Sequence, residues 1–166
     1  MAGMTFEDLP QDVRNIPLTD RRIAADVIDL LIGDGDRSAG CVALMVCDEE
    51  HRGILPIVLS DVPHDADLSA LVSLLDLLLP LVVERGGSLL MGRGRPGCGV
   101  PTDVDRAWHQ QTIECCRTHG VPLLGFHVAS RDGITALPEP LTPAGLGSAP
   151  TVGGQATLRE HTAYGD

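Results

Sequence analysis

The chain has 166 residues, of which 43% are hydrophobic and only 2% aromatic, and its formal net charge is −11. A chain of this length is typical of one domain and buries roughly two-thirds of the surface of its unfolded state. The acidic balance argues against a nucleic-acid-binding surface. All 12 basic residues are Arg, which excludes a lysine Schiff base and a P-loop lysine.

The sequence indicates a cytoplasmic protein that does not enter a membrane. Residues 1–18 contain no apolar leader, and the most apolar run, Leu68–Val83, is interrupted by Asp76 and Pro80 and is too short for a membrane span. The five cysteines are odd in number, and two of them are adjacent, which does not fit a disulfide framework. We expect a flexible or loosely docked lead-in over 1–18, one domain over 19–138 and a disordered, Pro- and Gly-rich tail over 139–166.

Hydrophobic periodicity and turn residues divide the domain into helices and strands. Helices are expected over Asp20–Ile32 with Thr19 as N-cap, from Leu68 to Gly86, and from Thr102 to about Thr118. Strands are expected at Cys41–Cys47, Ile54–Val62, Ser88–Met91, Val121–Ala129 and Ile134–Leu137. The segment 33–40 has the composition of a turn. This order predicts a three-layer α/β/α sandwich with a mixed sheet.

Two details of the sheet follow from the connections. The six-residue connector 48–53 is too short for a parallel crossover, so the first two strands form an antiparallel hairpin. Pro56 indicates that the second strand lies at an edge of the sheet or starts late. Ser88–Met91 is expected in the middle of the sheet, and ligands of open α/β sheets bind beyond the carboxyl ends of strands.

A glycine-rich segment, Gly92–Pro101, follows this middle strand. Its first six residues match the G-x-G-x-x-G pattern, but Pro96 removes one N–H and the next helix begins too late for a dinucleotide site. A looser anion site is an alternative, formed by Arg93 and Arg95 with Gly94, Gly97 and Thr102, because guanidinium groups suit carboxylate and phosphate. The simpler interpretation is that both Arg are solvated or pair with Asp103 and Asp105.

This segment resembles the RadC-like branch of the JAB/MPN metalloproteins, which carry H-x-H-P-x-G after a strand and P-S-x-x-D at a helix start. The chain has Arg93-Gly94-Arg95-Pro96-Gly97 and then Pro101-Thr102-Asp103-Val104-Asp105. Both metal-binding histidines are therefore Arg, which cannot ligate a cation. The resemblance covers roughly residues 40–138. It implies a degenerate relative without a metal, in which Asp105 alone remains of the metal triad.

Two further resemblances carry less chemistry. The order of elements is similar to that of the zinc deaminases, with His64-Asp65-Ala66 and Pro96-Gly97-Cys98 at the places of their motifs. Ala66 stands where a deaminase has its catalytic Glu, so activated water is not expected. The whole chain also resembles a family of small acidic actinobacterial proteins, and this resemblance implies no particular function.

Histidines offer the remaining candidates for acid–base chemistry. His109, one turn into the third helix, is either a base beside the glycine-rich segment with Arg93 and Arg95, called here the arginine loop, or a solvent-exposed residue. His127 lies within a strand, where a buried histidine with satisfied hydrogen bonds is the more common arrangement.

We therefore expect a non-catalytic, metal-free JAB-like binding or scaffold domain, without a cofactor, that acts as a homodimer or binds a protein partner. The alternative is a small-molecule enzyme or an anion- or nucleotide-binding regulator. It would use Arg93 and Arg95, supported by Asp103, Asp105 and His109.

Overall fold

The computed structural model describes residues 14–63 and 65–139. The expectations for residues 1–13, His64 and 140–166 fall outside these described residues. Leu18 is buried and its backbone N–H donates to the carbonyl of His51 at 2.8 Å, so this part of the lead-in is attached to the domain.

Five strands form one mixed sheet in the order β2-β1-β3-β4-β5. They are β1 (Cys41–Cys47), β2 (Gly53–Ser60), β3 (Ser88–Gly94), β4 (Leu123–Ser130) and β5 (Gly133–Ala136). β3 and β4 are parallel, whereas all other neighbours are antiparallel. The hairpin of β1 and β2 and the central place of β3 are confirmed. Pro56 lies in β2, which is an edge strand as predicted.

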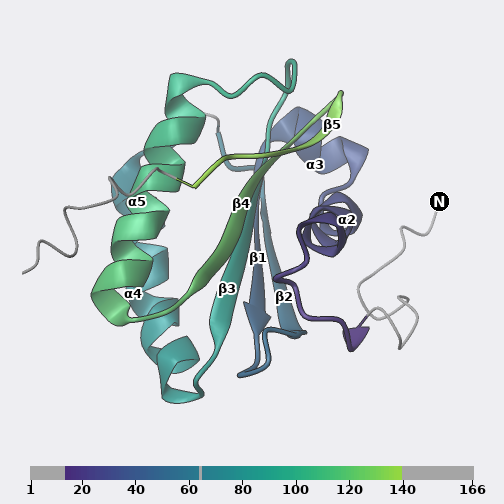
Figure 1. Cartoon of the computed structure of the whole chain (residues 1–166). Helices are drawn as coiled ribbons and strands as arrows, with labels where there is room; N and C mark the ends of the chain where they lie inside the picture. Colours follow the sequence, from purple (N-terminus) through teal and green to yellow (C-terminus); the bar gives the residue numbers. More distant parts are fainter. Residues whose placement is uncertain (1–13, 64, 140–166) are drawn as a thin grey trace, which may run out of the picture.

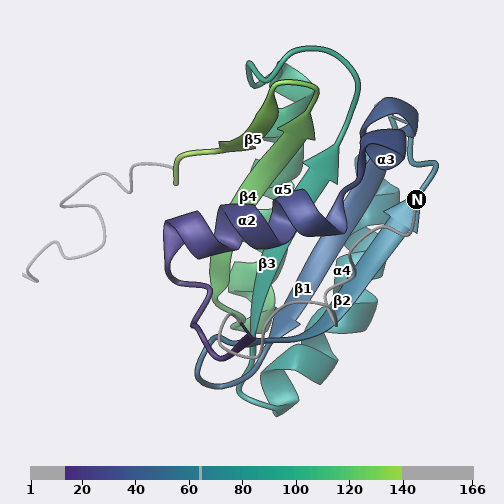
Figure 2. The same ribbon diagram turned by 90° about the vertical axis from the view of Figure 1, so that its right-hand side faces the viewer.

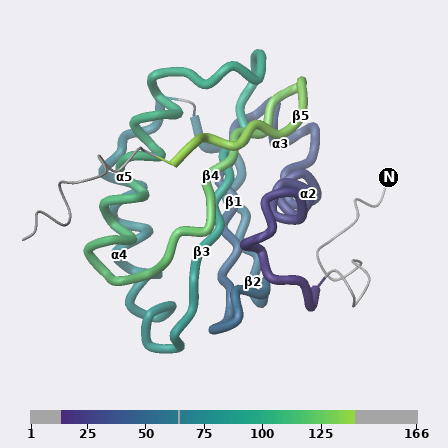
Figure 3. The backbone as a smooth tube through the Cα atoms, in the orientation of Figure 1, coloured from purple at the N-terminus to yellow at the C-terminus, as the bar shows by residue number. Residues whose placement is uncertain are grey.

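The helices are α2 (Arg21–Leu31), α3 (Asp34–Ala39), α4 (Leu68–Glu84) and α5 (Asp103–His119). α2 and α3 lie on one side of the sheet and α4 and α5 on the other (Figure 1). Figure 2 shows α2 crossing the strands, and the backbone tube in Figure 3 shows the chain after β5 passing from the α2 side toward α5. Within 14–63 and 65–139, no helix is long and apolar enough to span a bilayer.

Both faces of the central strands are buried, which explains why their sequences are continuous apolar runs rather than alternating ones. All seven residues of β1 and all seven of β3 are buried. One core lies between the sheet and α4 and α5, around Leu75, Leu79 and Phe126. The second lies under α2, around Ile28 and Ile32.

Several predicted boundaries differ from the structure. Asp20, not Thr19, caps α2, because its carboxylate accepts from the N–H groups of Arg22 and Ile23. The segment 34–39 is the short helix α3 rather than a turn. α4 contains Pro80, as expected of a helix from Leu68 to Gly86, and it ends at Glu84. The packing of α4 against the sheet outweighs the loss of the backbone hydrogen bond that Pro80 cannot donate.

The most important difference is at the glycine-rich segment, since its first three residues belong to β3 rather than to a loop. A Cβ added at Gly92 would stand 2.8 Å from Cγ2 of Ile28, and one added at Gly94 would stand 2.6 Å from Sγ of Cys41. Glycine at these positions therefore allows close packing within the core under α2 and α3. It does not form a phosphate-binding turn.

We expect Gly92→Ala to lower the free energy of unfolding by about 1–3 kcal/mol, because the added methyl overpacks the core under α2. Gly35→Ala in α3 is the matched control. Its added Cβ meets nothing within 4 Å, and alanine favours a helix by up to about 1 kcal/mol. Urea unfolding of the three proteins measures the difference. Equal stability of Gly92→Ala and the wild type would show that the contact does not constrain β3.

Candidate functional site

The end of β3 and the start of α5 bring Arg93, Arg95 and Asp105 together in the interior. Arg93 belongs to β3, Arg95 follows it directly, and Asp105 lies in the first turn of α5. The three residues are 2%, 5% and 0% exposed, respectively. We call these three residues the Arg–Asp cluster.

A capping box fixes Asp105 in position. The Thr102 hydroxyl accepts from the backbone N–H of Asp105 at 3.2 Å, and Oδ2 of Asp105 accepts from the N–H of Thr102 at 2.8 Å. This reciprocal pair satisfies two N–H groups at the start of α5. The same carboxylate thus caps the start of α5 and also accepts hydrogen bonds from the two arginines.

Arg95 uses its whole guanidinium group within the chain. Its Nε lies 3.0 and 2.9 Å from the two carboxylate oxygens of Asp105, and Nη2 donates to Oδ2 at 2.7 Å. Nη1 donates to the carbonyls of Pro96 and Cys98, and Nη2 also donates to that of Val100. A guanidinium has five N–H donors, and these contacts account for all of them. Arg95 therefore holds the loop 96–100 against α5.

Arg93 approaches the same carboxylate from the strand. Its Nη1 lies 3.2 Å from Oδ1 of Asp105, and its Cζ lies 4.7 Å from the ring centroid of Trp108. The indole is 3% exposed, so this cation–π contact is protected from water. Trp108, one turn after Asp105, was not predicted as part of the site. Its helical spacing from Asp105 is the signal that could have indicated it.

Burial and ion pairing shift the pKa values of Asp105 and Arg93 in opposite directions. Burial raises the pKa of Asp105, but the hydrogen bonds from Arg95 and Thr102 and the charges of both arginines outweigh it, so this pKa lies below its usual value. Burial lowers the pKa of Arg93, and the charge of Asp105 opposes that effect. Asp105 is therefore ionised at neutral pH.

The other predicted site residues do not join this cluster. Asp103 is exposed and pairs with Arg106 at 2.9 Å. Gly94 faces Ile32 and Cys41, and Gly97 adopts a φ of 95° in the loop that Arg95 binds. The pairing of both arginines with Asp105 is confirmed, whereas neither arginine is solvated. An anion site at Arg95 has no free donor there and stays a prediction.

His109 lies in a different environment from either prediction for it. It is buried rather than solvent-exposed, and its ring stacks on Phe126 with centroids 5.1 Å apart. Burial lowers its pKa, and the charge of Glu139 opposes that shift in part. His109 lines a hollow with Arg117, Leu137 and Glu139, beside β4 and away from the arginine loop.

The described side chains offer little basis for metal binding or for thiol chemistry. Among residues 14–63 and 65–139, no group of three or more His, Cys, Asp or Glu residues could hold a metal ion. All five cysteines are free thiols, and only Cys98 is exposed. Burial raises the pKa of Cys116 to about 12, so that thiol is protonated at neutral pH.

Sequence reasoning also missed a larger cavity on the other face of β4, lined by Arg21 and His127 among others. Gly125, two residues before His127, was the available signal, since a glycine inside a strand often marks a bulge or a close approach.

Comparison with known proteins adds nothing to the geometry: no family model, no curated protein and no solved structure matches this chain.

We expect Arg95→Met to lower the free energy of unfolding by about 3–5 kcal/mol, because it leaves a buried carboxylate short of its main partner and frees three loop carbonyls. Arg106→Met removes an ion pair of α5 that is exposed, and it should change stability by about 0.5 kcal/mol or less. Chemical denaturation compares the two variants. Similar costs for both would mean that burial does not strengthen the Arg95–Asp105 pair.

Asp105 should also make stability depend on pH. Its pKa is lower in the folded state than in the unfolded state, so its contribution is complete above the ordinary carboxyl pKa of about 4 and is lost as pH falls through the folded-state pKa. Denaturation of the wild type between about pH 7 and pH 2 should show this loss, and Asp105→Asn should lack the corresponding slope. Asp103→Asn, at a fully exposed position, should keep it. An unchanged slope in Asp105→Asn would contradict the assignment.

Proposed function

We propose that this chain is a non-catalytic binding or scaffold protein whose core is a degenerate JAB-like domain. In this proposal the helices and mixed sheet form a three-layer α/β/α sandwich with the element order of the RadC-like branch. The resemblance of the 93–105 segment to the H-x-H-P-x-G and P-S-x-x-D motifs supports it. The same proposal places the protein in the reducing cytoplasm, consistent with five free thiols.

The observation that carries the proposal is the Arg–Asp cluster. Arg93 and Arg95 stand at the positions of the family's two metal-binding histidines, and Asp105 stands at that of its metal-binding aspartate. Both oxygens of Asp105 accept hydrogen bonds from arginine, and Oδ2 also accepts one from Thr102. Since a guanidinium is always protonated and cannot ligate a cation, the cluster supplies internally the positive charge that a metal would bring.

A binding role needs a surface, and the opposite edge of the sheet offers one. β2 is an edge strand without a charged residue, and Ile54 and Leu55 are each 50% exposed. On α4, Leu77 and Leu81 are 75% and 58% exposed. Exposed apolar groups of this kind often mark protein–protein contacts. Ile54 and Leu55 are neighbours in a strand and therefore point to opposite faces of the sheet, whereas Leu77 and Leu81 are four residues apart on one face of α4. We propose that the exposed leucines of α4 form the interface of a homodimer.

Two measurements on the full chain test the proposal. Metal analysis after equilibration with zinc should find much less than one zinc per chain. Any small amount of zinc that remains bound should be lost in Cys98→Ser, which lacks the exposed thiol. One zinc per chain retained in Cys98→Ser would overturn the metal-free assignment.

Sedimentation should show a dimer at about 100 μM that the double substitution Leu77→Glu, Leu81→Glu converts to a monomer. Val100→Glu is the matched control, because Val100 is 68% exposed but lies on the arginine loop. A monomeric wild type at this concentration would contradict the homodimer, without affecting the result of the metal analysis.

A further inference from the structure

A cavity of about 580 Å³ lies beside β4, on the side of the sheet that α2 covers. We call it the β4-edge cavity. It is lined by Arg21, Ala24, Leu124, Gly125, Phe126, His127, Ala136, Leu137, Pro138 and Glu139. Its size lies in the range of pockets that hold small molecules, which are lined mainly by apolar groups with a few placed polar ones.

The cavity exists because β5 covers only half of β4. β5 pairs with His127–Ser130, and the N–H of Leu137 still donates to the carbonyl of Phe126 at 2.9 Å. Beyond this point the chain leaves the sheet, and on this edge of β4 no strand among the described residues pairs with Leu123–Gly125. The pairing register with β3 also shifts in this part of β4.

The polar group at the floor of the cavity is His127. It is 3% exposed, and its Nδ1 has no hydrogen-bond partner among the described residues. A Cβ on Gly125 would stand 3.0 Å from Cε1 of the same ring, so glycine here keeps the space around the imidazole open. An unpartnered buried nitrogen is destabilising, and such atoms are rare in native structures.

The protonation state of His127 tells what it can bind. Burial lowers its pKa, and a hydrogen bond to the backbone of Met91 opposes this in part by favouring the protonated ring. A neutral imidazole has one N–H and one lone pair. With the ring proton on Nε2, Nδ1 carries the lone pair and can accept a hydrogen bond from a ligand.

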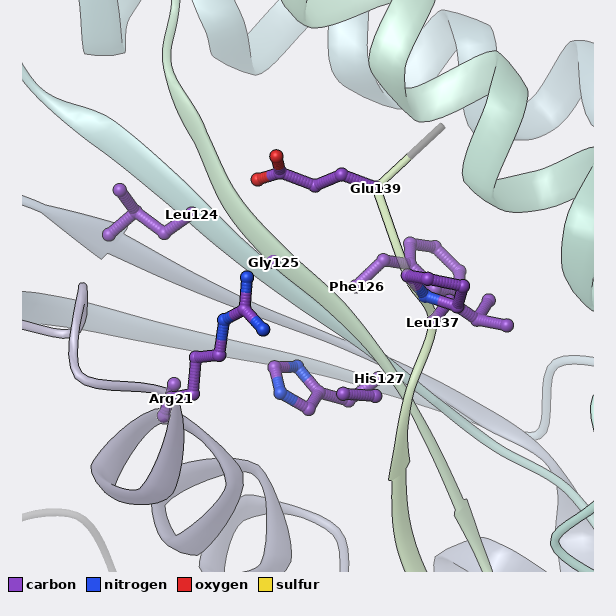
Figure 4. Close-up of a pocket in the computed structure, with 10 residues that line it drawn as sticks. Arg21, Leu124, Gly125, Phe126, His127, Leu137 and Glu139 are labelled. Carbon is purple, nitrogen blue, oxygen red and sulfur yellow. The ribbon is translucent and has the colours of Figure 1, made fainter. Parts of the chain in front are cut away.

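Two opposite charges border the same space. Figure 4 shows the guanidinium of Arg21 and the carboxylate of Glu139 on either side of the hollow, with the His127 ring nearby. Within the described part of the chain, neither side chain forms an ion pair. Arg21 can bind a carboxylate in bidentate fashion, whereas Glu139 can accept hydrogen bonds only.

We propose that the β4-edge cavity binds a small apolar α-amino acid, with its carboxylate on Arg21 and its ammonium group between Glu139 and Nδ1 of His127. The apolar side chain would lie against Leu124 and Leu137. This arrangement pairs every charge of the ligand and supplies the donor that Nδ1 lacks. The proposal does not depend on the Arg–Asp cluster or on the scaffold function.

Calorimetric titration of the full chain with L-leucine tests the proposal, using three analogues as additional arms. 4-Methylpentanoate lacks the amine, 3-methylbutylamine lacks the carboxylate, and 2-hydroxy-4-methylpentanoate replaces the ammonium group by a hydroxyl. We expect saturable binding of L-leucine and at least about tenfold weaker binding of each analogue, since each one leaves a charge of the cavity unpaired. No binding of L-leucine at about 10 mM, or equal binding of an analogue, would overturn the proposal.

A pair of variants tests whether the ligand binds in the cavity. Arg21→Gln should weaken L-leucine binding at least about tenfold by removing the carboxylate partner. Arg22→Gln changes the neighbouring exposed arginine, which does not line the cavity, and should bind as the wild type does. Both positions are exposed, so both variants should melt near the wild-type temperature. Equal binding by the two variants would overturn the assignment of Arg21.

Discussion

Asp105 has no exposed surface, and a buried carboxylate is costly unless it is paired and hydrogen-bonded. The structure meets this requirement with Arg93 from the central strand, Arg95 from the loop after it and the N–H of Thr102 at the start of α5. Because Arg95 also binds three carbonyls of the loop, one ionic contact fixes the end of β3, the path of the loop and the start of α5 together. Those segments form the part of the fold where an open α/β sheet would usually bind a ligand.

The glycines of the same segment acquire a different meaning in this context. Gly92 and Gly94 lie inside β3 with α2 and α3 close against them, so the G-x-G-x-x-G pattern arises from helix–sheet packing. The core under α2 and the Arg–Asp cluster thus constrain successive residues of one strand. Small residues allow close approach on one face, and charged residues bind the neighbouring helix from the other.

The sequence was sufficient to predict the central strands, the hairpin of β1 and β2, the edge position of β2 and the capping of α5 by Thr102, because each depends on local pattern or loop length. It also indicated Asp105 as a partner of the two arginines. It could not show that Arg93 and Arg95 are buried, since arginine is usually exposed and only the tertiary structure supplies so many acceptors. For the same reason it missed Trp108 and the buried environment of His109. The β4-edge cavity depends on where the chain leaves β5, which no local pattern encodes.

The central claim is that Arg95 is a buried structural cation rather than a ligand-binding one. Hydrogen exchange of the arginine side-chain Nε–H, followed by NMR at neutral pH, tests it most directly. The account predicts that this proton in Arg95 exchanges only through global or large-scale opening, whereas that of Arg131, whose side chain is 75% exposed, exchanges freely. Exchange of the Arg95 proton as fast as that of Arg131 would contradict the account.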